Sequence, residues 1–192
     1  MKNMIIVPGR PDKDEYLDMS APAYSADHWY SWLTKQLQVQ GIFSVSIEIP
    51  RPFSPRYDVW KREFERYDIG PETILVGHSC GGGFLGRWLS ENKNIKVDKV
   101  FLVAPWINPE NNPVSDTADF FDFEVDPQLT NRANRVVIIN SSNDQETIHK
   151  SVDILREKIP TIKYIEFEKM GHFCREDLGG EAFPELFKEI IG

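Results

Sequence analysis

Short apolar runs of the β type alternate along this chain with stretches in which apolar residues recur every three or four positions. The runs cover about residues 4–7, 43–49, 73–77, 100–103, 135–140 and 163–167. The intervening helical faces carry Trp29, Trp32, Leu33 and Leu37; Trp60, Phe64 and Tyr67; Phe84, Leu85, Trp88 and Leu89; Ile148, Val152, Leu155 and Ile159; and Phe183, Leu186, Phe187 and Ile190. Spacing of three or four marks one face of an α-helix, whereas a short apolar run marks a buried strand.

The middle strands are apolar throughout, which predicts a parallel sheet with helices on both faces. Right-handed crossovers, with a reversal after the second strand, give a six-stranded α/β fold of strand order 2-1-3-4-5-6. Residues 163–167 alternate between polar and apolar positions, as an edge strand does. We expect one domain over residues 1–192, a first helix that starts near Asp27 as its N-cap, and loops over residues 8–25 and 104–131.

The apolar run 74–76 leads into Gly77-His78-Ser79-Cys80-Gly81, a Gly-X-Ser-X-Gly pattern that two further glycines follow. Directly after a buried strand and before a helix, this pattern predicts a nucleophile elbow, a tight turn that exposes the serine hydroxyl above the sheet. Ser79 is then the candidate nucleophile. The backbone N–H of Cys80, at the start of the next helix, is the candidate donor to an oxyanion.

A serine hydroxyl needs a base, and the base needs a carboxylate that orients it. His172 follows the last strand in a C-terminal loop, where the base of such a fold is expected. His28 and His149 fall in helical stretches, and His78 lies within the elbow. Asp144 follows the fifth strand and is the candidate acid; its rivals are Asp116, Asp119, Asp122 and Asp126. In the alternative interpretation, Asp144 caps a helix and His172 is a surface residue.

The 192 residues carry 30 acidic and 22 basic side chains, a net charge of −8, and the sequence pI is about 5.1. This balance argues against nucleic acid and anionic membranes as partners. No apolar run approaches the ~20 residues of a membrane span, and the first apolar run is too short for a signal peptide. No spacing suggests a metal site, and free thiols at Cys80 and Cys174 are favoured over a redox pair. We expect a cytoplasmic protein that acts on a small molecule without a cofactor.

Several motifs point to one family: Ile6-Val7-Pro8-Gly9, His28-Trp29-Tyr30-Ser31-Trp32-Leu33, Gly77-His78-Ser79, Asp144, and Gly171-His172-Phe173. Together they resemble the small serine hydrolases of the retinoblastoma-binding protein 9 type, a compact branch of the α/β-hydrolases. The resemblance covers nearly the whole chain. It implies a triad of Ser79, Asp144 and His172, and an oxyanion hole formed by the backbone of Cys80 and Arg10. Members often have Asn where this chain has Arg10.

Two sets of side chains bear on what the site binds. Arg10 either binds a substrate carboxylate or pairs with Asp12, Asp14 or Glu15, and the loop pair is favoured. The 104–131 loop carries the candidate pocket residues Trp106, Phe120, Phe121 and Phe123. It also carries six carboxylates and no Lys or Arg: Glu110, Asp116, Asp119, Asp122, Glu124 and Asp126. The aromatic residues either line an apolar pocket with an acidic rim or, as is favoured, pack down as a small satellite core.

These residues predict a serine hydrolase that cleaves a small ester, thioester or amide through an acyl-enzyme. Two interpretations from other classes stay open. One is a binding protein that keeps the hydrolase scaffold with a little-used triad, and the other is an acyltransferase or lyase with the same fold. A fluorophosphonate probe separates the first alternative from the hydrolase, because only a competent serine reacts with it.

Overall fold

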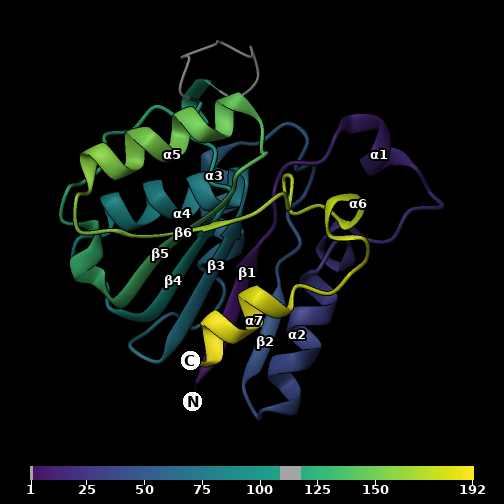
Figure 1. Ribbon diagram of the computed structural model, residues 1–192, viewed down its shortest axis with the longest axis horizontal. Coiled ribbons are helices and arrows are strands. Elements are labelled where there is room, and N and C mark those ends of the chain that lie inside the picture. Colours follow the sequence, from purple (N-terminus) through teal and green to yellow (C-terminus); the bar gives the residue numbers. More distant parts are fainter. Residues whose placement is uncertain (1, 109–117) are drawn as a thin grey trace.

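Six parallel strands form one sheet in the order β2-β1-β3-β4-β5-β6, as the sequence predicts (Figure 1). The computed structural model describes residues 2–108 and 118–192. The strands are β1 (Asn3–Val7), β2 (Phe43–Ser46), β3 (Thr73–His78), β4 (Val97–Val103), β5 (Ala133–Ser141) and β6 (Lys163–Phe167). Ile5 of β1 pairs with Val45 of β2 on one side and with Leu75 of β3 on the other. The winding of the chain therefore reverses beside β1.

Helices cover both faces of the sheet. They are α1 (Lys13–Leu17), α2 (Tyr30–Val39), α3 (Tyr57–Phe64), α4 (Cys80–Glu91), α5 (Glu146–Lys158), α6 (Arg175–Leu178) and α7 (Pro184–Ile191). Three 3₁₀ turns lie at Tyr24–Ala26, Ala118–Phe120 and Leu129–Arg132. α3, α4 and α5 lie on one face, and α2 and α7 on the other (Figure 1). Ring contacts agree, because Trp60 of α3 meets Phe84 of α4 and Trp32 of α2 meets Phe187 of α7, with centroids 5.8 and 6.2 Å apart.

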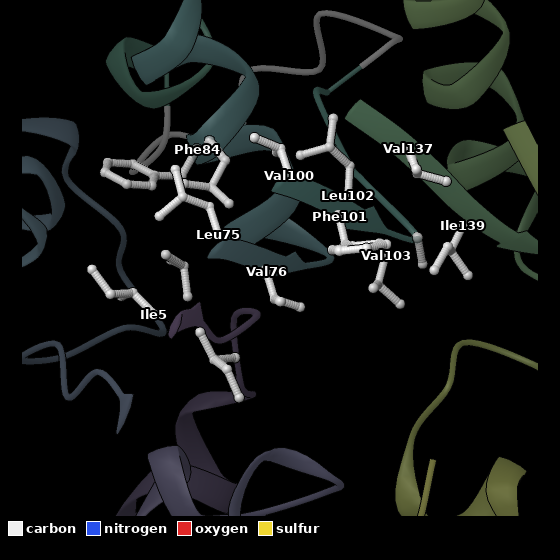
Figure 2. Packing of buried hydrophobic residues seen from close by; sticks show 14 of the residues in the cluster. Ile5, Leu75, Val76, Phe84, Val100, Phe101, Leu102, Val103, Val137 and Ile139 are labelled. Atoms are coloured by element: carbon white, nitrogen blue, oxygen red, sulfur yellow. The ribbon is translucent and has the colours of Figure 1, made fainter. Parts of the chain in front are cut away.

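The hydrophobic core fills the space on both sides of the central strands (Figure 2). Leu75 and Val76 are neighbours in β3 and so point to opposite faces of the sheet, yet neither has any exposed surface. This double burial explains why the strand is apolar at every position rather than alternating. Each such side chain contributes about 1.5–3 kcal/mol by leaving water. None of the helices in the described ranges is long and apolar enough to cross a membrane.

Two elements differ from the sequence prediction in the segment that leads to the helix expected near Asp27. α2 begins at Tyr30 and Asp27 does not cap it. The Asp27 carboxylate instead accepts the N–H of His28 at 2.7 Å and pairs with Arg175 at 2.5 Å. The predicted cap is wrong because a residue far along the chain takes the same carboxylate. Within the predicted 8–25 loop, α1 forms one short helix that buries none of its residues.

The start of α4 lies in contact with the end of β1, and only glycine fits at the contact. A Cβ on Gly81 would lie 2.1 Å from the Val7 carbonyl oxygen and 2.4 Å from that of Pro8. A Cβ on Gly77 would lie 2.5 Å from the Gly81 carbonyl oxygen. A Cβ on Gly86, one and a half turns further along the helix, would have no atom within 4 Å. The first two glycines therefore set the distance between strand, turn and helix.

Replacing these glycines tests that constraint. Gly81→Ala should destabilise the fold by at least ~1–3 kcal/mol, because the new methyl group overlaps backbone atoms that cannot move aside. Gly86→Ala, in the same helix, should be neutral or stabilising by ~0.5–1 kcal/mol, because alanine favours helix and the space is open. Urea denaturation measures both free energies of unfolding. Equal effects of the two substitutions would contradict the close approach of α4 to β1.

Candidate active site

Ser79 lies at the carboxyl end of β3, in the turn that leads into α4. Its backbone has φ +52° and ψ −119°, a conformation that is costly for a residue with a side chain. The Ser79 N–H donates to the Val103 carbonyl at 2.9 Å, and its carbonyl accepts the N–H groups of Gly83 and Trp106, both at 3.1 Å. The partly exposed serine therefore has the strained and firmly bonded backbone that a nucleophile elbow requires.

His172 and Asp144 come together from two loops at the same edge of the sheet. His172 Nδ1 lies 3.0 Å from Asp144 Oδ1 and 3.1 Å from Oδ2. The Asp144 side chain has no exposed surface, whereas the His172 side chain is 18% exposed. Because an ionised carboxylate only accepts hydrogen bonds, Nδ1 carries the proton of the neutral ring and Nε2 is the acceptor. This tautomer is the one that a general base needs.

Side chains of the acid loop, residues 141–144, bind the backbone of the histidine loop, residues 169–174. The bonds join Ser141 Oγ to the Met170 N–H at 2.7 Å, Ser142 Oγ to the Lys169 N–H at 3.1 Å, and Asn143 Oδ1 to the Gly171 N–H at 2.9 Å. The Ser141 hydroxyl also donates to Asn143 Oδ1 at 2.8 Å. The two loops thus form one hydrogen-bonded unit, which fixes the distance between Asp144 and His172.

Asp177 of α6 holds the other side of the histidine loop. Its Oδ2 accepts the N–H of His172 at 2.8 Å and the N–H of Cys174 at 3.2 Å. A Cβ on Gly171 would lie 2.2 Å from the Asp177 carboxyl carbon, and Gly171 has φ +52°. Glycine is therefore required beside the base for both its backbone conformation and its size.

The other histidines have different environments. His78 is buried, and its two ring nitrogens lie 2.6 Å from the Tyr30 hydroxyl and 2.8 Å from the His172 carbonyl oxygen. With both nitrogens engaged, His78 cannot take a proton from Ser79. His28 and His149 have Nδ1 close to other residues: His28 accepts the Arg175 N–H at 3.3 Å, and His149 lies 3.1 Å from Asn140 Nδ2. His172 is therefore the histidine whose surroundings suit a base.

Ser79 Oγ and His172 Nε2, both in the described part of the chain, do not form a hydrogen bond. In unliganded enzymes such catalytic bonds are often long, and they tighten when substrate binds. The rings of His78 and His172 lie 5.1 Å apart between centroids. The base is therefore held against the residue that directly precedes Ser79.

The backbone N–H groups of Arg10 and Cys80 suit the oxyanion role that the resemblance implies. Within residues 2–108 and 118–192, neither donates to an acceptor on another residue. The Gly9 N–H, in contrast, donates to the Tyr30 hydroxyl at 3.4 Å. A Cβ on Gly9 would lie 3.2 Å from Ser79 Cβ, so the loop after β1 passes directly beside the serine. Two N–H groups without acceptors thus come from segments that adjoin Ser79.

The side chain of Arg10 is anchored by backbone rather than by a carboxylate. Its Nε donates to the Phe53 carbonyl at 3.0 Å. Across the described ranges it forms no ion pair, so the favoured pairing with Asp12, Asp14 or Glu15 is not formed. The two terminal NH₂ groups of the guanidinium are therefore left for another acceptor.

Both cysteines are free thiols. Burial raises the pKa of Cys80 and of Cys174 to about 12. A thiol that stays protonated at neutral pH is a poor nucleophile and a poor metal ligand. The described residues also contain no group of three or more His, Cys, Asp or Glu side chains that could hold a metal ion.

The aromatic residues of the 104–131 loop lie in different places. Phe120 is 1% exposed and packs on Trp60, with ring centroids 4.9 Å apart, so it belongs to the core. Phe121 meets Trp106 edge-on at 4.7 Å. Phe123 and Phe121 line a cavity of about 510 Å³. The loop therefore contributes to both the core and a cavity.

The four described carboxylates of the same loop do not form a continuous rim. The Asp126 carboxylate pairs with Arg132, whereas Asp119 contacts Arg87 through its backbone carbonyl. Asp122 and Glu124 line the 510 Å³ cavity, together with Lys158. Glu110 and Asp116 lie outside the described residues. Among the described acids of this loop, Asp122 and Glu124 are therefore the two that line a cavity.

A second cavity, of about 310 Å³, lies beside the loop that follows β1. Its charged lining residues are all carboxylates: Glu15, Asp18, Asp27 and Glu48. Tyr24 also lines this cavity. A Cβ on Gly9 would lie 3.4 Å from the Tyr24 hydroxyl and 3.2 Å from Ser79 Cβ. Tyr24 thus lies between this acidic cavity and Ser79. Arg175 neutralises Asp27 from outside the lining.

Comparison with known proteins gives evidence of the family to which this chain is related. A family model described as serine hydrolase matches residues 21–190. The chain is 27% identical over 181 residues to YdeN of Bacillus subtilis, named as a candidate hydrolase, and the match covers 91% of this chain and 93% of that protein.

Solved structures show the same arrangement. The crystal structure of the ydeN gene product from B. subtilis has a TM-score of 0.81 at 23% identity and covers 100% of this chain and 97% of that one. Est1E from Butyrivibrio proteoclasticus, with ferulic acid bound, has a TM-score of 0.71 at 12% identity over 100% of this chain and 88% of that one. At these identities the likeness shows the fold. The family match covers most of the chain, so this protein belongs to the serine hydrolase family and has the α/β-hydrolase fold.

Proposed function

We propose that this chain hydrolyses a small ester, thioester or amide, with Ser79 as nucleophile, His172 as general base and Asp144 as the acid that orients the base. The observation that carries the proposal is the pairing of His172 Nδ1 with the buried Asp144 carboxylate at 3.0 Å. It lies at the edge of the sheet where Ser79 has its strained backbone. The net charge of −8 favours a small molecule over nucleic acid as the partner.

Acylation begins when His172 Nε2 takes the Ser79 proton while Oγ attacks the substrate carbonyl carbon. The carbonyl electron pair moves onto oxygen, and the N–H groups of Arg10 and Cys80 donate to that oxyanion. When the intermediate collapses, the leaving group takes the proton from the imidazolium. Water then gives a proton to the same nitrogen as its oxygen attacks the acyl carbon. When this second intermediate collapses, the bond between Ser79 Oγ and the acyl carbon breaks, the acid leaves, and the imidazolium returns the proton to Oγ.

Asp144 contributes by holding one tautomer and by stabilising the imidazolium that forms. Its side chain is fully buried against His172, and a charge interaction out of water is stronger than the same interaction in water. The Asp144 carboxylate also accepts the Gln145 N–H at 2.6 Å, which fixes its orientation. No cofactor is needed for this sequence of steps.

Ser79→Ala should abolish turnover, at a cost on the order of 10⁶ in kcat, because the residual rate then comes from binding and the oxyanion donors alone. Hydrolysis of p-nitrophenyl esters of increasing chain length measures it, and the same series reports the preferred acyl length. A fluorophosphonate probe should label the wild type and Ser31→Ala but not Ser79→Ala. A wild type that the probe does not label would favour a binding protein on a hydrolase scaffold.

Asp144→Asn should lower kcat by roughly 10⁴, because the amide leaves the geometry in place but disfavours the required His172 tautomer. The loss should be smaller than that of Ser79→Ala. Asp122→Asn and Asp126→Asn are the matched controls and should stay near wild type in the same ester assay. A near-normal Asp144→Asn beside an inactive control would reassign the acid.

Substrate charge should matter, because three of the four carboxylates around the 310 Å³ cavity, those of Glu15, Asp18 and Glu48, form no ion pair within the described residues. Such a field raises the local concentration of cations and is screened by salt over ~10 Å. We expect kcat/KM to be higher for an ammonium-tailed ester than for a matched carboxylate-tailed one at low salt, and the difference to shrink at high salt. Glu48→Gln should reduce the difference, whereas Glu157→Gln on α5 should not.

The opposite preference would identify Arg10 as the recognition group. In that outcome the carboxylate-tailed ester is the better substrate, and Arg10→Leu removes the preference. Equal values for the two esters at low salt would contradict both electrostatic interpretations.

A further inference from the structure

His78 occupies the variable position of the Gly-X-Ser-X-Gly turn, yet its side chain is tightly held. The residue is 2% exposed. Its Nδ1 lies 2.6 Å from the Tyr30 hydroxyl and its Nε2 lies 2.8 Å from the His172 carbonyl oxygen. The indole of Trp29 packs edge-on against the ring at 5.7 Å between centroids. One side chain therefore links α2, the elbow and the histidine loop.

The partners of His78 fix the direction of these hydrogen bonds. A carbonyl only accepts, so Nε2 carries the proton, Nδ1 accepts, and the Tyr30 hydroxyl donates. The Tyr30 oxygen in turn accepts the Gly9 N–H at 3.4 Å. Burial, helped by the nearby His172 and His28 rings, holds the pKa of His78 well below its usual range, and burial also raises the pKa of Tyr30. Both groups stay neutral near pH 7, so the bonds keep one direction.

The histidine loop needs such support because its backbone is strained. Gly171 has φ +52° and Phe173 has φ +58°, on either side of His172. A non-glycine residue at positive φ persists where its surroundings hold it there. Phe173 is fully buried and stacks on Phe183 at 5.1 Å.

Each polar group of His172 except one has a partner within the described chain. Asp177 accepts its N–H, His78 donates to its carbonyl, and Asp144 accepts from Nδ1. Nε2 alone is left, and it is the atom that would take the serine proton. His172 is thus hydrogen-bonded at each of its polar atoms except the one that would react.

We propose that His78, directed by Tyr30, is a positioning residue that sets the place of His172 relative to Ser79. The inference rests on the proposed roles of Ser79 and His172. His78 precedes Ser79 in the chain, so one residue carries the nucleophile on its backbone and holds the base through its side chain. Small movements of the turn then carry the nucleophile and the base together, and their separation is preserved.

A purely structural role for His78 predicts a different result. Losing a buried hydrogen bond lowers the unfolding temperature wherever the bond lies, and activity then follows the folded fraction. A positioning role adds a loss of kcat in fully folded enzyme, because a displacement of about 1 Å can cost on the order of 10²-fold. The side chain of His78 is buried and offers a substrate almost no surface to contact, so KM should stay unchanged.

The test compares His78→Leu, which removes the donor, with His78→Gln, whose amide N–H reaches about as far as the histidine Nε2–H. Tyr30→Phe removes the hydroxyl that directs His78 and keeps the ring. Val97→Ala, at the amino end of β4 and 2% exposed, is the control for a destabilised fold far from the site. Unfolding temperature, kcat, KM and the rate of fluorophosphonate labelling are measured for all four at a temperature where each is folded.

We expect His78→Leu to lower kcat and the labelling rate by about 10- to 100-fold at unchanged KM. His78→Gln should recover most of this loss, Tyr30→Phe should fall between them, and Val97→Ala should keep wild-type kcat. If His78→Leu fails to fold, the comparison of kcat between Tyr30→Phe and Val97→Ala tests the inference instead.

A kcat of His78→Leu or Tyr30→Phe equal to that of Val97→Ala overturns the inference, as does a change confined to KM. Ser79→Ala, assayed alongside, separates the two hypotheses. If it is active, the proposed function fails; if it is inactive while His78→Leu is normal, the positioning role alone fails.

Discussion

The distance between the start of α4 and the end of β1 is set by the absence of a side chain at Gly81, which lies against the Val7 and Pro8 carbonyls. Parallel strands bring their carboxyl ends, and so their loops, to one edge of the sheet. That topology alone does not set how close the loops lie. The glycine contact closes the gap, so that the residues after β1 and the residues after β3 adjoin the same serine. The place of Ser79 relative to the loop after β1 depends on that contact.

Polar side chains complete what the backbone topology begins. The loops after β5 and β6 are joined by serine and asparagine side chains of one to the N–H groups of the other. The histidine loop is held in addition by Asp177 and by His78. Where such a bond is buried, as at His78, a missing partner is costly. His172 is therefore held by several segments that lie apart in the sequence.

The sequence predicted the strand order because apolar runs alternate with helical patterns and crossovers are right-handed, and it made Ser79 the candidate nucleophile because a glycine pattern followed such a run. Asp144 and His172 were found from their places after strands, and the structure brings them within 3.0 Å of each other. The contributions of Tyr30, His78 and Asp177 were missed, because they depend on side-chain contacts that no local pattern records. The cap at Asp27 was wrong for the same reason, since Arg175 lies far along the chain. The polar run Ser141-Ser142-Asn143 after an apolar strand was the available signal for the loop contacts.

α1 has the opposite character to these loops. It is a five-residue helix with no buried side chain, and with the 3₁₀ turn Tyr24–Ala26 it belongs to the segment that borders the acidic cavity. Local opening of such a segment costs little free energy, whereas opening of β3 requires most of the core to be lost. Native-state hydrogen exchange should therefore be fast across α1 and slow across β3. The border of the acidic cavity can then change its shape while the sheet stays intact.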